Sequence, residues 1–254
     1  MKLRTAVITS FITGISLIAG TFKAQAMSLV PQTEGEIQLT NVSCLGGSIT
    51  CIDTTSLGYT VTTQPFDFDN KGLQLGTSRL FVDKPTTANN WGFGITFKVP
   101  DAGTNPIEEY VFRPVAYLAN NPEAAPTGTP AENGQLEIGR YLFDFLGKTY
   151  SEVEIKFYDV EALTSGIIKV NDIDVNDLLS PGLNNNVQTL TLKNVSNFVI
   201  QLGTTDSAIK PGDGVSFDVS VPEPTSVLGL AAVAATAVVG MRKSRKLANK
   251  GVGV

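Results

Sequence analysis

The stretch GVSFDVSV, from Gly214 to Val221, decides the fold class. Its apolar residues alternate strictly with polar ones, so Val215, Phe217 and Val219 share one face when the chain is extended. Alternation with a period of two is typical of a strand that packs one face against a core. We therefore predict a β-strand immediately before the last segment of the chain.

The same alternation recurs outward from this stretch. SEVEIKFYD (151–159) and NFVIQL (197–202) both place apolar residues at every second position. Short polar segments rich in Asn, Asp, Gly and Pro separate these runs, as turns do. We predict an all-β protein with a single antiparallel β-sandwich, expected to be a jelly roll. The further predicted strands cover 36–42, 58–63, 73–81, 92–99, 109–118, 136–145, 166–170 and 187–192.

Two segments interrupt this pattern. The longest segment without alternation, 119–134, is rich in Pro, Asn and Gly, and we predict a surface loop there. A short helix is predicted over 176–179.

The beginning of the chain has the layout of a secretory signal peptide. Lys2 and Arg4 precede an apolar stretch over 6–22, which is followed by Ala24-Gln25-Ala26. Small residues at these last positions are the cleavage signal of exported proteins. We predict an N-terminal signal helix over residues 1–26 and cleavage after Ala26. A permanent membrane anchor is the alternative reading of the same segment.

The other end carries a second apolar segment. Residues 225–241 contain no charge, although this run is shorter than the ~20 residues of a comfortable bilayer span. Basic residues follow at once, as expected of a cytoplasmic flank. We predict a C-terminal transmembrane helix with the body outside the membrane. The basic cluster consists of Arg242, Lys243, Arg245 and Lys246.

The order of these C-terminal parts resembles the PEP-CTERM sorting signal. Pro222-Glu223-Pro224 stands directly before the apolar run and the basic cluster. The resemblance implies export by a bacterium that makes exopolysaccharide, and processing of the tail by an exosortase. It divides the chain into a signal peptide (1–26), an ectodomain (27–221), a sorting signal (222–246) and a short tail (247–254).

A second stretch is similar to a subgroup of these proteins. LEIGRYLFDF (136–145) resembles the Leu-Glu-Val-Gly stretch of that subgroup, with Ile138 at the position of Val. This resemblance supports the sorting and sandwich predictions and implies no chemical activity.

Composition excludes several function classes. The chain has 24 acidic and 19 basic residues, and eight of the basic ones lie in the terminal segments, so the ectodomain is strongly acidic. An acidic domain repels phosphate backbones, so we predict no nucleic-acid partner. The chain has no histidine, which excludes Ser-His-Asp and Cys-His catalysis and the usual histidine metal sites.

The two cysteines of the chain are Cys44 and Cys51, in CLGGSITC. Because exported proteins meet oxidising conditions, we predict a disulfide between them. Gly46-Gly47 between them suggests a tight turn, which would place the cysteines opposite each other on a hairpin.

Acidic residues in NDIDVND give a candidate metal site. Asp172, Asp174 and Asp177 could gather around calcium, which prefers oxygen ligands, and Asp159 with Glu161 forms a second pair. Solvated turn carboxylates are the simpler alternative reading of the same residues. No other cofactor is predicted. DFDNKG (67–72) begins like an EF-hand loop but lacks the ligands at its fifth and twelfth positions.

Trp91 in NNWGFG is the candidate carbohydrate contact, together with Phe93 as an aromatic platform. The alternative places Phe93 in the core and Trp91 at an edge. Paired carboxylates for glycoside hydrolysis are not evident, since Glu108 and Glu109 are adjacent and would point to opposite faces of a strand.

These observations predict an exported, non-catalytic protein of the cell surface or extracellular matrix, anchored in the membrane before processing. Its partners would be signal peptidase, exosortase, the membrane and exopolysaccharide, and its role structural or adhesive. The alternative is a secreted carbohydrate-active enzyme that uses paired carboxylates.

Overall fold

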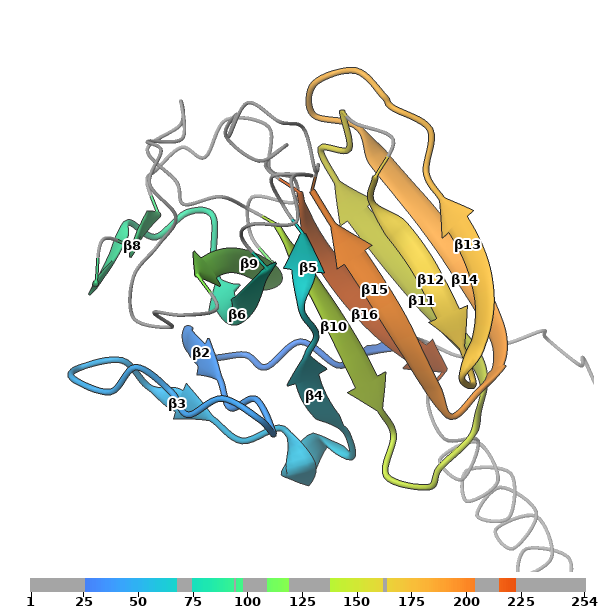
Figure 1. Ribbon diagram of the computed structural model, residues 1–254, viewed down its shortest axis with the longest axis horizontal. Helices are drawn as coiled ribbons and strands as arrows, with labels where there is room; N and C mark the ends of the chain where they lie inside the picture. The colour runs from blue at the N-terminus through green and yellow to red at the C-terminus, as the bar shows by residue number, and fades with distance from the viewer. Residues whose placement is uncertain are drawn as a thin grey trace, which may run out of the picture.

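The computed structural model describes residues 26–67, 75–93, 95–97, 109–118, 138–161, 164–203 and 215–222. These residues form an all-β body, in which the short 3₁₀ turn η1 (Thr55–Leu57) accompanies sixteen strands (Figure 1). Within those ranges, no helix is both long and apolar enough to cross a membrane.

Two large sheets make up most of the body (Figure 1). The larger has the order β14-β11-β16-β9-β6-β2-β3, with β1 paired to β16 and β5 to β6. The smaller has the order β13-β12-β15-β10-β4. All pairs are antiparallel except β2 with β3. The larger sheet consists of β1 (Ala26–Ser28), β2 (Gly35–Ile37), β3 (Cys51–Ile52), β5 (Phe66–Asp67), β6 (Leu75–Asp83), β9 (Val111–Leu118), β11 (Tyr150–Tyr158), β14 (Val187–Val195) and β16 (Ser216–Pro222). The smaller consists of β4 (Thr60–Thr63), β10 (Gly139–Asp144), β12 (Gly166–Val170), β13 (Ile173–Leu178) and β15 (Asn197–Leu202).

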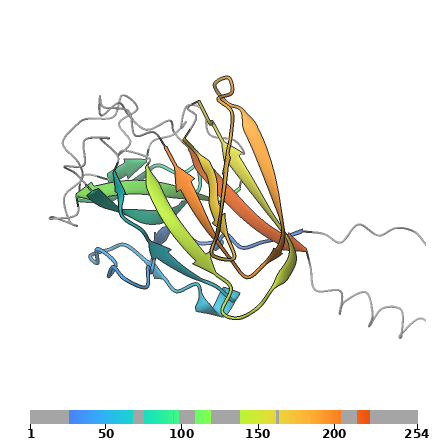
Figure 2. The same cartoon turned by 45° about the vertical axis from the view of Figure 1, so that its right-hand side comes forward.

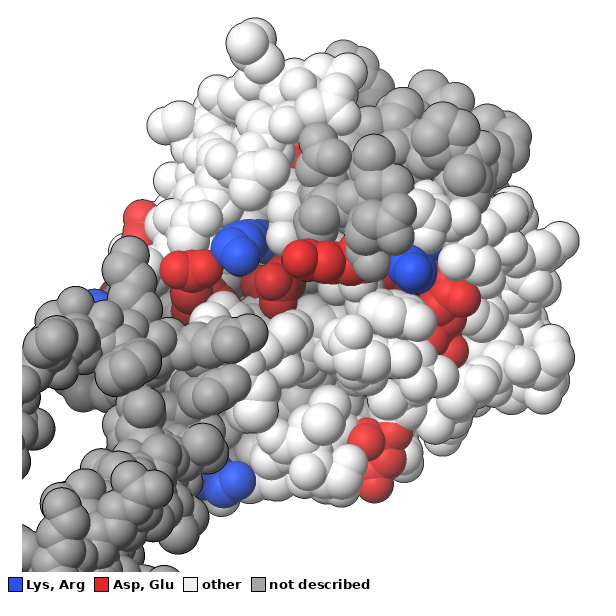
Figure 3. Space-filling model, turned by 180° about the vertical axis from the view of Figure 1, so that it is seen from behind, with Lys and Arg blue, Asp and Glu red and all other residues white. Residues whose placement is uncertain are grey.

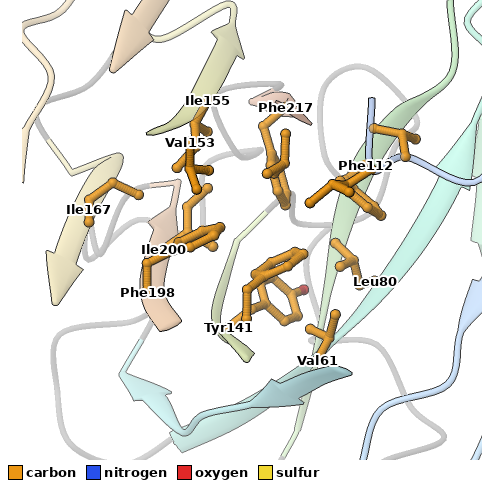
Figure 4. Close-up of a cluster of buried hydrophobic side chains, with 14 of the residues drawn as sticks. Val61, Leu80, Phe112, Tyr141, Val153, Ile155, Ile167, Phe198, Ile200 and Phe217 are labelled. Atoms are coloured by element: carbon orange, nitrogen blue, oxygen red, sulfur yellow. The ribbon is translucent and has the colours of Figure 1, made fainter. Parts of the chain in front are cut away.

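The core lies between these two sheets, as their sequence alternation predicts. Phe143 of β10 stacks on Phe198 of β15 with 5.0 Å between ring centroids, and its edge meets Phe112 and Phe217 of the larger sheet. Figure 4 shows Phe112, Phe198 and Phe217 pointing into the same space. Burial of such rings removes 150–250 Å² each from water and is the main force that holds the sheets together.

A second, smaller core lies around β6 and β9. The two-stranded sheet of β7 (Asn89–Gly92) and β8 (Ile95–Phe97) covers Phe81 and Val115 there. Phe97 meets Phe81 edge-on, and the guanidinium of Arg113 lies 4.4 Å from the centre of the Phe97 ring. This cluster fixes the position of Trp91 on β7.

Most predicted strands are present, but the predicted helix over 176–179 is wrong. Residues Ile173–Leu178 form β13, which pairs with β12 after a turn at Asn171 and Asp172. Both turn residues have positive φ, as a two-residue hairpin requires. Every residue of β13 is exposed, so no buried face marked it as a strand. The predicted strand over 92–99 is divided between β7 and β8, and the predicted loop over 119–134 lies outside the described residues.

Both sheets terminate together at one end of the body, which we call the exit end. It comprises η1, the turns at 145–149, 171–172 and 196, and the residues Ala26 and Pro222. The five residues between β10 and β11 and the single residue between β14 and β15 connect the two sheets there. The start of β1 (blue) and the end of β16 (orange-red) meet at this end (Figure 2).

Candidate functional site

β1 occupies a special position beside β16. The first half of β16 pairs with β9 through Phe217 and Phe112, whereas its last three residues pair with β1. The main-chain N–H of Leu29 donates to the carbonyl of Val219 at 2.7 Å, which extends this pairing. A gap lies over β16 between β1 and the residues that precede β9.

This gap is part of an acidic groove on the outer face of the larger sheet. A hollow of about 490 Å³ lies over β16 between β1 and Glu109, and a second of about 670 Å³ lies toward β11 and β14. Figure 3 shows acidic side chains interspersed with basic ones across this face. The ionisable residues that line the acidic groove are Glu109, Glu152, Glu154, Lys156, Lys193 and Asp218.

Strand register brings the charges of the groove together. Lys156 of β11 lies opposite Asp218 of β16, and its ammonium is 3.7 Å from the carboxylate of Glu154. Lys193 of β14 lies opposite Glu152 and forms an ion pair with it. Both positive and negative groups therefore face the groove, which suits a polar ligand such as a saccharide.

Asp218 is the most perturbed carboxyl of the groove. It is 8% exposed, and the hydroxyl of Ser28 donates to it at 3.3 Å. Burial raises the pKa of Asp218, Lys156 and the Ser28 hydrogen bond lower it, and the carboxylates of Glu109 and Glu154 raise it again, with a net rise. Burial and the carboxylates of Asp218, Glu109 and Glu154 also raise the pKa of Tyr158. A carboxyl with a raised pKa beside other carboxylates is a feature of the acid–base pairs found in active sites.

Sequence reasoning missed this group because its members are far apart in the chain. Glu109 precedes β9, Glu154 is on β11 and Asp218 is on β16. The polar positions of the two alternating strands were the available signal, since Glu154 and Asp218 both lie on the faces opposite the core. Glu108 lies outside the described residues.

The predicted calcium residues do not form one cluster. Asp172 is in the turn before β13, and Asp174 forms an exposed ion pair with Lys169 at 3.2 Å. Asp177 lies opposite Ile167 at the other side of a register shift. Among the described residues, no group of three or more His, Cys, Asp or Glu is arranged to hold a metal ion. The calcium site stays a prediction without support from this arrangement.

Trp91 and Phe93 lie in the reverse of the alternative positions, which place Phe93 in the core and Trp91 at an edge. Trp91 is half-buried against Phe81, with 5.9 Å between ring centroids, and its indole nitrogen is buried without a hydrogen-bond partner among the described residues. Phe93 is 45% exposed and has a positive φ. The exposed ring available to a ligand is thus that of Phe93. Carbohydrate contact by Trp91 stays a prediction.

The disulfide between Cys44 and Cys51 is present, as predicted. It does not close a β-hairpin, however, because Cys51 is on β3, which runs parallel to β2, and Cys44 is in the preceding loop. The loop is tied to Glu36 of β2, whose carboxylate accepts a hydrogen bond from the N–H of Leu45 at 2.7 Å.

A buried ion pair lies beside the disulfide loop. The guanidinium of Arg79 is 2.5 Å from the carboxylate of Glu36, and it also donates to the carbonyl of Ser43. Both side chains are at most 5% exposed. Burial raises the pKa of Glu36, and its hydrogen bonds from Leu45 and Arg79 offset part of that rise.

Of the predicted sorting signal, the structure describes Pro222, which is half-buried at the end of β16. Glu223, Pro224, Arg242, Lys243, Arg245 and Lys246 lie outside the described residues.

No family model matches the chain, and neither a curated protein nor a solved structure is significantly similar to it.

Proposed function

We propose that the chain is an exported bacterial protein of the cell surface or matrix. Its signal peptide is removed after Ala26, and its PEP-CTERM-type tail anchors the body until an exosortase processes it. One observation carries the proposal most directly. Ala26 and Pro222, which flank the expected ectodomain, are partners at the outer end of β1 and β16.

This pairing supports the proposal because it makes the two boundaries compatible with one folded body. Cleavage after Ala26 leaves Met27 and Ser28 in place to pair with Val221 and Ser220. Processing beyond Pro222 likewise removes nothing from β16. The Cys44–Cys51 disulfide is consistent with an oxidising compartment.

The body itself is proposed to be a β-sandwich. The shared core between the two sheets supports this class. The jelly-roll connectivity remains a prediction.

For the role of the body, we propose non-catalytic binding within exopolysaccharide. The acidic groove offers carboxylates, lysines and the hydroxyls of Ser28 and Ser220 to a saccharide. The exposed ring of Phe93 is a separate candidate platform, because aromatic faces pack against sugar rings.

A secreted carbohydrate-active enzyme is the second candidate function. The observation that favours it is the groove itself, where Asp218, with a raised pKa, lies near the carboxylates of Glu109 and Glu154, since glycosidases use pairs of carboxyl groups. In this case Asp218 would act as the general acid.

The sorting part is tested by changing Glu223 and Pro224 together to Ala. We expect the variant to accumulate with its tail uncleaved, whereas the wild type is processed. The matched control is Lys250→Ala, which lies outside the sorting signal and leaves processing unchanged. Normal processing of the double variant would contradict the sorting proposal.

The binding part is tested on the exported protein with an array of polysaccharides, together with assays for released sugar. Non-catalytic binding predicts retention without release, weakened by changes in the groove or at Phe93. Trp91→Ala is a poor probe because it removes packing on Phe81. Sugar release that is abolished by Asp218→Asn would establish the enzyme instead.

A further inference from the structure

The exit end displays apolar side chains in addition to the chain ends. Of the large apolar residues that are exposed in the described structure, Met27, Leu57, Leu146 and Ile173 lie at this end, with exposed fractions of 39%, 40%, 50% and 68%. Strand register places Leu57, Leu146 and Ile173 near one another, because Thr60, Asp144 and Asn197 occupy one row across β4, β10 and β15. Met27 lies opposite Val221, near the end of β16 in the larger sheet.

Leu146 is unusual for its position. It is the first of two central residues in a tight turn that is closed by a hydrogen bond from the N–H of Lys148 to the carbonyl of Phe145. Leu146 and Gly147 both have positive φ, at 54° and 79°. Such turns favour Asn-Gly, and leucine in the left-handed region is disfavoured. The turn therefore holds a leucine outward at a conformational cost that no burial of its side chain offsets.

The chain beyond Pro222 leaves from this same end. Only Glu223 and Pro224 separate Pro222 from the uncharged run 225–241. A fully extended chain covers at most about 3.5 Å per residue, so the run begins within about 10 Å of Pro222. A helix of this run would span about 26 Å, slightly less than the ~30 Å hydrocarbon layer. If this run spans a bilayer, the short connection keeps the exit end close to the headgroup region.

We propose that the exit end is the membrane-facing surface of the anchored protein, with Leu146 and Leu57 inserted among the lipid headgroups. This inference rests on the proposed membrane anchor. Lys148 is exposed beside Leu146, and its side chain lies next to Gly58, which follows η1, so an ammonium accompanies the two leucines. Asp53 and Asp172 are exposed at the same end, so the contact depends on apolar insertion more than on attraction to anionic lipid.

Leu183 provides a matched control. It is 86% exposed in the segment between β13 and β14, at the opposite end of the body. β14 has nine residues, and at about 3.3 Å per residue it separates the two ends by roughly 25–30 Å. A probe at Leu183 is thus beyond the headgroups when a probe at Leu146 is among them.

The experiment uses the full chain in phosphatidylcholine vesicles that contain lipids with a nitroxide-labelled headgroup. Leu146→Cys, Leu57→Cys and Leu183→Cys each receive one fluorophore, because the native cysteines are joined in the disulfide. We expect several-fold stronger quenching at positions 146 and 57 than at 183, with little change in high salt. Equal quenching at all three positions, or quenching only with anionic lipid at low salt, would overturn the proposal.

A flotation assay on the same samples separates this proposal from the anchor itself. A chain that does not float with the vesicles contradicts the membrane anchor, and a chain that floats without selective quenching contradicts only the orientation. Leu146→Asn adds a test that folding defects do not confound, since asparagine suits the turn. We expect this variant to keep its melting temperature and to lower quenching of the probe at 57, whereas Leu183→Asn leaves that quenching unchanged.

Discussion

Ala26 lies directly opposite Pro222 in the antiparallel pairing of β1 with β16. The two segments expected to direct export and sorting therefore join the body at adjacent points. A new N-terminus at Met27 would begin inside a β-ladder, where its pairing with Val221 is retained. Processing of both chain ends would therefore take place beside the same pair of strands, β1 and β16.

The acidic groove predicts a specific pH dependence. The pKa of Asp218 in the folded protein is raised above its usual value of 3.8, so the folded state keeps a proton that the unfolded chain releases. Stability from this group is therefore greatest at and below that value and falls as the pH rises through the folded pKa. We expect Asp218→Asn to flatten the decline of the melting temperature as the pH rises above 3.8. Glu36 contributes in the same direction, so part of the slope remains. An unchanged slope would argue against the assigned environment of Asp218.

The disulfide stabilises the loop that carries Ile49 into the smaller core. Replacing Cys44 and Cys51 together by Ser is expected to lower the free energy of unfolding by about 2–3 kcal/mol, since a bridge across so few residues restricts only a short loop of the unfolded chain. Urea denaturation of both proteins measures this difference. Thiol labelling of the natively exported protein should detect no free cysteine, and two reactive thiols would contradict the oxidised state.

The buried ion pair predicts a larger loss of stability on substitution than an exposed ion pair does. Glu36→Gln removes one carboxylate from beside the buried guanidinium of Arg79, and we expect the free energy of unfolding to fall by about 3–5 kcal/mol. Asp174→Asn, which breaks the exposed pair with Lys169, is the control and should change stability by less than about 1 kcal/mol. Equal effects of the two single changes would show that burial does not strengthen the first pair.

The ring of Phe143 connects the two sheets. Phe143→Ala removes its contacts with Phe198, Phe112 and Phe217, and we expect it to lower the free energy of unfolding by about 3–5 kcal/mol. Phe93→Ala is the matched control, because that ring is exposed and its loss should have a small effect. Comparable denaturation midpoints for the two variants would contradict the central position of Phe143.

Strand positions could be predicted where one face is buried. Val153, Ile155 and Phe157 alternate with charged residues, and β11 was predicted nearly to its ends. β13 was missed because Ile173 and Val175 alternate without any burial, and its pairing depends on β12. Sequence alternation reports a buried face, so a strand that is exposed on both faces gives no reliable signal.

The candidate site was harder to predict than the strands. The cysteine pair follows from the export signal and short spacing, and it could be predicted from the sequence. The proximity of Glu154 and Asp218 depends on the register of β11 with β16, and that of Glu109 on the position of β9 beside β16. No local sequence pattern records either pairing. The packing of Trp91 on Phe81 could not be predicted either, because it depends on the long-range position of β7. Sugar contact by Trp91 stays a prediction.

Intact-mass spectrometry of the protein recovered from the cell surface or medium tests export and sorting together. We expect a chain that begins at Met27, contains the Cys44–Cys51 disulfide and lacks the basic cluster at its C-terminus. Recovery of the chain from the cytoplasm, with residues 1–26 and the tail intact and both cysteines reduced, would contradict it.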